Sequence, residues 1–147
     1  MTIEDKELLL KDLCSRLPYG VQTLADLDKE FDGGVIGRLV GIVPTGKKDD
    51  IQGHLFYQET CLTPFTIEEI RPYLRPMSSM TEEERKEYQK FLFPCPDYDG
   101  RVVVGVYHRD LYKVYDYLNS RHFDYHGLIE KGLAIEAPEG IYNHYNS

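Results

Sequence analysis

Two histidines in the C-terminal part of the chain are the residues whose spacing best suits metal chemistry. His122 and His126 lie four positions apart, so on one helix they would share a face and could bind the same ion. No HExxH arrangement occurs, and Asp124 between them is better explained as the cap of a short helix that ends at Gly132. We therefore predict no metal site. If the protein were instead a metal-dependent hydrolase, His122 and His126 would be its candidate metal ligands.

Motifs for nucleophilic catalysis and phosphate binding are absent from the sequence. Cys95 lies between two prolines, but no recognisable base signature surrounds it, and no GxSxG string occurs. The segment GGVIGRLVG lacks both the GK[ST] ending of a P-loop and the GxGxxG spacing. Its glycines, Gly37 and Gly41 among them, are typical of turns and bulges in a curved sheet. We predict no catalytic residue and no cofactor, and we favour a protein that is not an enzyme.

Cationic and aromatic side chains around the string RPYLRP form the candidate small-molecule site. Pro72 and Pro76 each disfavour helix at the preceding residue, so we expect this segment to be an extended, stiff connector. Such a segment could present its arginines to a nucleotide or another small molecule on the sheet. If such a molecule binds in a pocket on the sheet, the residues expected to line that pocket are Arg71, Tyr73, Arg75 and His54.

Twelve tyrosines and a formal net charge of -8 characterise the expected surface. An acidic chain repels the nucleic-acid backbone, so no nucleic-acid partner is expected. Helical spacing places Tyr115 in the core, which leaves Tyr112 and Tyr117 off the apolar stripe. Exposed tyrosines favour protein–protein surfaces, although half-buried tyrosines that cover a small core are the alternative. The main hypothesis is therefore a non-enzymatic interaction module with an acidic surface that carries Tyr112 and Tyr117; self-association is left open.

Capping signals mark the starts of two further helices. Thr2 is followed three residues later by Asp5, and this first helix should end at Pro18. Thr81 with Glu84 forms a capping box for a second helix. A third helix is expected from the apolar spacing near residues 110–121.

Between Val21 and Thr66 short apolar runs joined by Gly/Asp turns indicate strands. The apolar run at 101–107 predicts one more strand, which would complete or extend the sheet. We predict an α+β fold: an N-terminal helix, a small curved antiparallel sheet or SH3-like barrel, and C-terminal helices packed on one side. Residues 1–147 should form a single domain, with 136–147 a loosely held tail.

The expected compartment is the cytoplasm. The acidic N-terminus does not suit a signal peptide, and no run of eighteen apolar residues predicts a membrane span. The three cysteines, Cys14, Cys61 and Cys95, are scattered without a CxxC pair, which is typical of reduced thiols.

Three strings of the sequence resemble a family of small hypothetical proteins from gut Bacteroidetes genomes, often found in prophage-like or other mobile regions. They are LPYG (17–20), IRPYLRPMSSMTEEE (70–84) and YLNSRHFDYHGLIEKGLAIEAPEG (117–140). Between Gln22 and Phe65 the match is loose. The resemblance implies an origin in the cytoplasm of a bacterium or its phage, and it supplies no catalytic residues.

Overall fold

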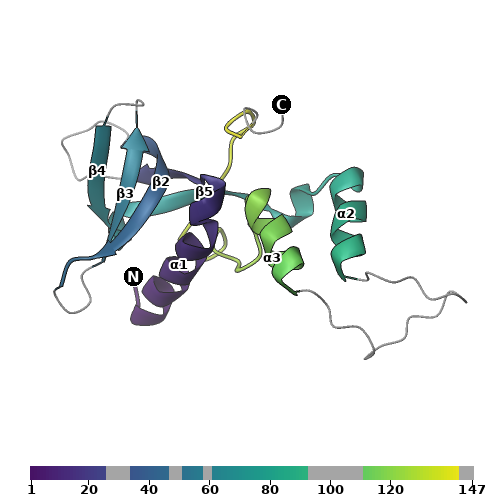
Figure 1. Cartoon of the computed structure of the whole chain (residues 1–147), viewed down its shortest axis with the longest axis horizontal. Coiled ribbons are helices and arrows are strands. Elements are labelled where there is room, and N and C mark those ends of the chain that lie inside the picture. Colours follow the sequence, from purple (N-terminus) through teal and green to yellow (C-terminus); the bar gives the residue numbers. More distant parts are fainter. Residues whose placement is uncertain (26–33, 47–50, 58–60, 93–110, 143–147) are drawn as a thin grey trace, which may run out of the picture.

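The structure is a computed structural model, and it describes residues 1–25, 34–46, 51–57, 61–92 and 111–142 of the 147-residue chain. Helix α1 (Ile3–Arg16) comes before a mixed sheet, and helices α2 (Glu82–Leu92) and α3 (Leu111–Ser120) lie together beyond one end of it (Figure 1). The fold is α+β, as predicted. The strand expected at 101–107 lies outside the described residues. Among the described residues, no helix has the length and apolar character needed to cross a membrane.

The described residues contribute seven strands to the sheet, in the order β4-β3-β2-β1-β5-β6, with β7 also paired to β5. The first four strands make the predicted antiparallel meander. Strand β5 pairs antiparallel with β1 but parallel with β6 and β7, so the sheet is mixed and the SH3-like barrel was a wrong expectation. The strands are β1 (Gln22–Ala25), β2 (Val35–Pro44), β3 (Ile51–Tyr57), β4 (Cys61–Thr66), β5 (Ile70–Pro76), β6 (Phe123–Asp124) and β7 (Ile135–Glu136).

Both predicted helix caps are present. The Thr2 hydroxyl accepts a hydrogen bond from the Asp5 amide at 3.1 Å, and α1 gives way to a 3₁₀ turn over Leu17–Tyr19 that contains Pro18. At the start of α2, the Glu84 amide donates to the Thr81 hydroxyl and the Thr81 amide donates to the Glu84 carboxylate, each at 3.1 Å. These bonds satisfy amides that have no partner inside the helix.

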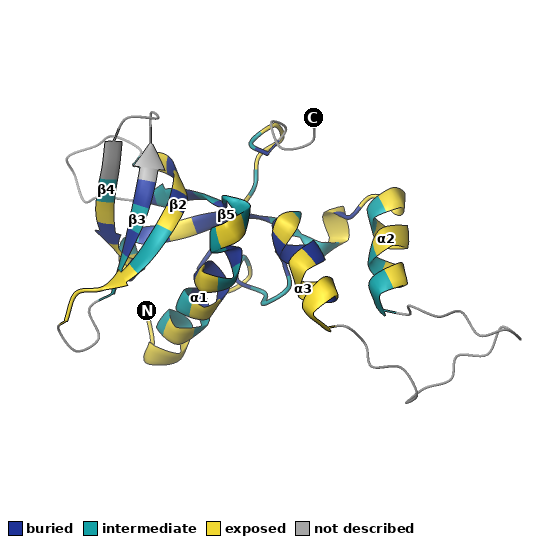
Figure 2. Ribbon diagram, in the orientation of Figure 1, coloured by how far each residue is buried: buried dark blue, intermediate teal, exposed yellow. Residues whose placement is uncertain are grey.

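Two apolar clusters hold the elements together. The larger one packs Leu9 and Leu13 of α1 against the sheet residues Leu39, Leu55 and Ile70. The smaller one joins α3 and β6 through the buried residues Met80, Val114, Tyr117, Leu118 and Phe123, and Tyr88, Phe91 and Leu92 of α2 pack against it. Burial accordingly follows one side of α1 and of α3, whereas the opposite sides are exposed (Figure 2).

The buried side of α3 differs from the predicted one. Tyr115 is 47% exposed, whereas Tyr117 is only 8% exposed, so both assignments were wrong. The Tyr117 hydroxyl donates to the Glu84 carbonyl at 3.1 Å, and its ring lies against Phe91, 5.4 Å between centroids. Positions 114, 117 and 118 have equally good helical spacing for a buried face. The contact with α2 buries this face of α3 and not the predicted one.

The segment after α3 is built from turns and two short strands. The Asp124 carboxylate accepts hydrogen bonds from the amides of Leu128 (2.8 Å) and Ile129 (3.0 Å), but hydrogen-bonded turns replace the predicted helix. Gly132 has φ 73°, the left-handed conformation expected at its position. The RPYLRP segment is extended, as predicted, but it is strand β5 and not a connector.

Candidate ligand-binding cavity

A cavity of about 540 Å³ lies where β5, the start of α2 and the end of the described chain meet. Arg75, Thr81, Glu84 and Arg121 form one side of it. Residues 137–142 form the other side, and we call this segment the C-terminal strap. The strap follows directly on β7, which pairs with β5, so the sheet positions both walls.

Arg75 and Glu84 form a bidentate ion pair in the cavity wall. Two parallel hydrogen bonds, of 2.8 and 2.7 Å, join the guanidinium to the carboxylate. The guanidinium also lies over the Phe123 ring, with 4.3 Å between Cζ and the ring centroid. The hydrogen bonds from Arg75 lower the pKa of Glu84 despite its partial burial. This pair therefore fixes two oriented charges at the N-terminal end of α2.

Two further charges line the cavity from opposite walls. Arg121 comes from the residue after α3, and its side chain is 39% exposed, with a long ion pair of 3.9 Å to Glu87. Glu139 belongs to the strap and is exposed. The cavity thus carries both cations and carboxylates, so it can hold a ligand with charges of both signs.

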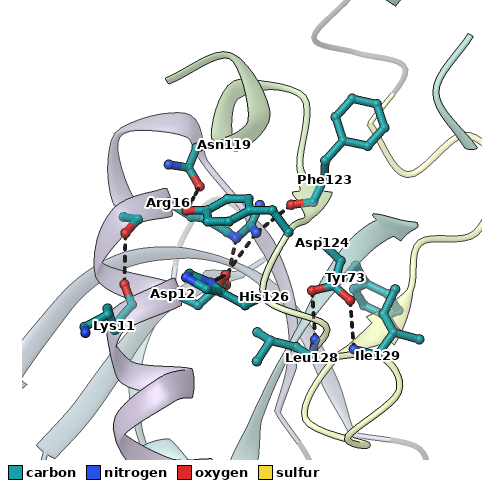
Figure 3. Close-up of polar contacts among 12 residues, drawn as sticks. Lys11, Asp12, Arg16, Tyr73, Asn119, Phe123, Asp124, His126, Leu128 and Ile129 are labelled. Atoms are coloured by element: carbon teal, nitrogen blue, oxygen red, sulfur yellow. Dashed lines mark hydrogen bonds and ion pairs between the residues drawn. The ribbon is translucent and has the colours of Figure 1, made fainter. Parts of the chain in front are cut away.

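A second concentration of polar groups is buried between α1 and the segment that follows β6 (Figure 3). Asp12 and Arg16, both fully buried, form a bidentate ion pair of 2.7 and 3.0 Å. Arg16 also donates to the Phe123 carbonyl at 2.7 Å. Burial disfavours ionisation of Asp12, but hydrogen bonds from His126 and Arg16 outweigh it, and the pKa of Asp12 is lowered.

His126 completes this polar cluster. Its Nδ1 lies 2.7 Å from Asp12 Oδ1, and its ring lies against Tyr125, 4.3 Å between centroids. Tyr125 in turn donates to the Asn119 side chain at 2.9 Å. The cluster links α1, α3 and the turns before β7, and we interpret it as a tie between elements.

His122 occupies a different environment from His126. Its ring is buried and stacked on Tyr142, with centroids 3.7 Å apart and planes 11° apart. Burial, together with the charges of Arg16 and Arg75, lowers the pKa of His122 to about 3. The two histidines therefore serve different contacts. No group of three His, Cys, Asp or Glu side chains within the described ranges is arranged to hold a metal ion.

The sequence profile of eukaryotic glutathione synthase matches residues 47–143. The chain belongs to this family. All residues that line the cavity fall inside the matched segment, whereas Asp12 and Arg16 of the buried cluster fall outside it. No curated protein and no solved structure matches the chain.

Within the glutathione synthase segment, only one of the four predicted ligand-binding residues lines the cavity. That residue is Arg75. Arg71 is exposed on β5, whereas Tyr73 of the same strand is buried and burial raises its pKa. His54 lies on β3, which is separated from β5 by two strands in the sheet order. The four residues do not share the cavity. Successive side chains of β5 point to opposite faces of the sheet, and β3 is not a neighbour of β5.

Other features of the site were missed from the sequence. Tyr142 is buried, and the Ala137 amide at the start of the strap donates to the Leu74 carbonyl of β5. Residues 143–147 and Cys95 lie outside the described residues, and Cys14 is a free, exposed thiol. One available signal was the position of Asp12 and Arg16, three and seven residues after Leu9 and therefore on the buried side of α1.

Proposed function

We propose that the chain is a small-molecule-binding protein whose cavity takes a zwitterionic ligand, either an amino acid or a short peptide. The observation that carries this proposal is the lining of the cavity by two arginines and two glutamates, namely Arg75, Arg121, Glu84 and Glu139. A volume of about 540 Å³ lies within the range of small-molecule sites. A ligand with a carboxylate and an ammonium group would pair with both kinds of side chain.

The family supports the same ligand class. Glutathione, which the family's name gives as the product, is a tripeptide that carries carboxylates and an ammonium group. The matched segment includes every residue of the cavity lining. This agreement favours a peptide-like ligand over the nucleotide that the arginines alone would equally suit.

The four charges have unequal roles in this proposal. Glu84 is already satisfied by two hydrogen bonds from Arg75, so that pair forms the floor. The ion pair of Arg121 is 3.9 Å long and lies on the surface, and such pairs contribute little to stability. In this proposal Arg121 binds the ligand carboxylate, and Glu139 binds the ammonium group.

Isothermal titration calorimetry with glutathione tests the proposal. We expect binding, and we expect Arg121→Gln and Glu139→Gln each to weaken it about tenfold, because each removes one charge-assisted hydrogen bond. Arg85→Gln is the matched control, since Arg85 is exposed on α2 and does not line the cavity. Absence of binding by the wild-type protein to glutathione and to simple amino acids, or equal weakening by Arg85→Gln, would contradict the proposal.

A second candidate function is the interaction module expected from the sequence, in a cytoplasmic protein of a bacterial phage or mobile element. It is supported by the exposed side of α3, where Tyr112 is 84% exposed and Leu111 and Tyr115 are also exposed. These residues lie at helical spacing along one side of the helix. Aromatic and apolar groups of this kind suit a protein partner, and the net charge of -8 favours one with a basic surface.

Affinity capture from a gut Bacteroidetes lysate, followed by titration of the captured protein, tests this second candidate. We expect Tyr112→Ser to weaken the complex at least tenfold, since an exposed aromatic anchor would be lost. Ile36→Ser is the control, because Ile36 is an exposed apolar residue on β2. Size-exclusion chromatography in parallel reports self-association. The candidate fails if neither a partner nor self-association is detected, or if both variants behave alike.

A further inference from the structure

The C-terminal strap supplies more of the cavity lining than any other segment. All six of its residues, 137–142, line the cavity. Its backbone follows β7 and lies next to β5, because the Ala137 amide donates to the Leu74 carbonyl at 2.7 Å. Within the strap, the Ile141 amide donates to the Pro138 carbonyl at 3.3 Å, and Gly140 has φ 92°, a conformation that favours glycine. The strap is thus a turn that is attached to the sheet at its first residue.

Tyr142 attaches the other end of the strap to the sheet. Its hydroxyl donates to the Tyr73 carbonyl at 2.6 Å and accepts from the Gln22 amide at 3.0 Å. Gln22 and Tyr73 directly flank the Thr23–Pro72 pair of the β1–β5 ladder. The hydroxyl therefore bridges the two strands where their pairing ends.

The ring of Tyr142 makes the third attachment. It stacks on His122 at 3.7 Å between centroids. The His122 carbonyl accepts from the Arg75 amide at 2.7 Å, and Arg75 is itself part of the cavity wall. Tyr142 thus contacts β1, β5 and the backbone that supports the opposite wall.

We propose that Tyr142 is a positioning residue that holds the strap closed, so that docking of the strap and binding of a ligand in the cavity are coupled. This inference rests on the proposed function of the cavity. A ligand that contacts both walls stabilises the docked strap, and loss of the Tyr142 hydroxyl lowers the fraction of molecules with a complete site.

Hydrogen exchange of individual amides, measured by NMR, tests the strap without any ligand. Tyr142→Phe retains the ring and its stack but removes both hydrogen bonds. We expect exchange at the Gln22, Ala137 and Ile141 amides to become at least tenfold faster, while amides in the β2–β3 ladder keep their protection. Tyr112→Phe is the matched control, since Tyr112 is highly exposed on α3, and it should change none of these rates.

Glutathione then tests the coupling. We expect it to slow exchange of the strap amides in the wild-type protein and to bind Tyr142→Phe about fivefold to tenfold more weakly than wild type or Tyr112→Phe. If neither glutathione nor simple amino acids bind the wild-type protein, the proposed function is wrong, and the exchange rates still decide whether Tyr142 holds the strap. Unchanged exchange in Tyr142→Phe, or ligand binding that leaves strap exchange unaltered, would overturn the inference.

Discussion

His122 shows how burial can determine the protonation state of one residue. It is the only non-glycine residue with positive φ, 62°, among the described residues. Its ring is buried against Tyr142 and lies near two arginines, which explains a pKa lowered to about 3 from 6.5. The neutral imidazole is therefore part of the folded structure, and adding a proton to it opposes folding.

Lowering the pH from 7.5 to 5 should consequently destabilise the protein through His122. Below its ordinary value of 6.5 the unfolded chain binds a proton that the folded chain does not bind, so stability is lost as the pH falls from about 6.5 towards 3. This residue alone should account for about 2 kcal/mol between pH 7.5 and pH 5. Urea unfolding at the two pH values measures it.

The variant His122→Phe isolates this contribution, because it retains a ring against Tyr142 but cannot titrate. Between pH 7.5 and pH 5, the decrease in the free energy of unfolding should be about 2 kcal/mol smaller for His122→Phe than for the wild type. An identical pH dependence in wild type and His122→Phe would show that the pKa of His122 is the same in the folded and the unfolded protein.

At the scale of elements, Gly53 allows the sheet to curve. A Cβ atom at this position of β3 would collide with the Ile70 side chain at the start of β5. The two strands are not neighbours in the sheet, so their contact lies across the curved face. A side chain here would force the Cδ1 methyl of Ile70 to move within the core, and the φ of Gly53 is not the reason for glycine.

Replacing Gly53 by alanine should destabilise the protein by about 1–3 kcal/mol, the usual cost of overpacking a core. Gly41→Ala is the matched control, since the nearest atom to its added Cβ would be His54 Cβ at 3.9 Å, an ordinary contact. Thermal unfolding of both variants measures the difference. The double variant Gly53→Ala/Ile70→Val should recover part of the loss, and equal stability of the two alanine variants would contradict this account.

Local signals predicted most of the elements correctly. The caps at Thr2 and Thr81 and the meander of β1–β4 depend on residues close in sequence, and all of them are present. The parallel pairing of β6 and β7 with β5 was not predicted. Each of these strands has two residues and pairs with a segment about fifty or more positions away, and so short a strand has no periodicity of its own.

The candidate site was predicted only in part for the same reason. Arg75 was identified because it lies in an unusual string between two prolines. Arg121, Glu139 and Tyr142 look like ordinary surface residues in the sequence. The position of α3 brings Arg121 to the cavity, and the path of the strap across β5 brings the other two there. Likewise, Tyr117 is buried in place of Tyr115 because α2 packs against that side of α3.

At the scale of the whole molecule, one buried ion pair joins the two ends of the described chain. Asp12 and Arg16 lie on α1, and their partners His126 and the Phe123 carbonyl lie more than a hundred residues later. The contact spans the larger apolar cluster and the smaller one, since Leu13 belongs to the first and Phe123 to the second. Its loss should therefore affect the entire cooperative unit.

Asp12→Asn should destabilise the protein by about 3–5 kcal/mol, because it leaves the charge of Arg16 buried without a counter-charge. Urea unfolding of Asp12→Asn, Arg16→Met and the double variant Asp12→Leu/Arg16→Met measures the interaction. The double variant should be more stable than Asp12→Asn, since it buries no charge, whereas Glu68→Gln, which breaks the exposed Lys6–Glu68 pair, should cost less than about 1 kcal/mol. A loss in Asp12→Asn no larger than in Glu68→Gln would mean that water reaches Arg16. If the ion pair couples the two apolar clusters, the unfolding transitions followed at α1 and at Tyr125 should also coincide in the wild type and separate in Asp12→Asn.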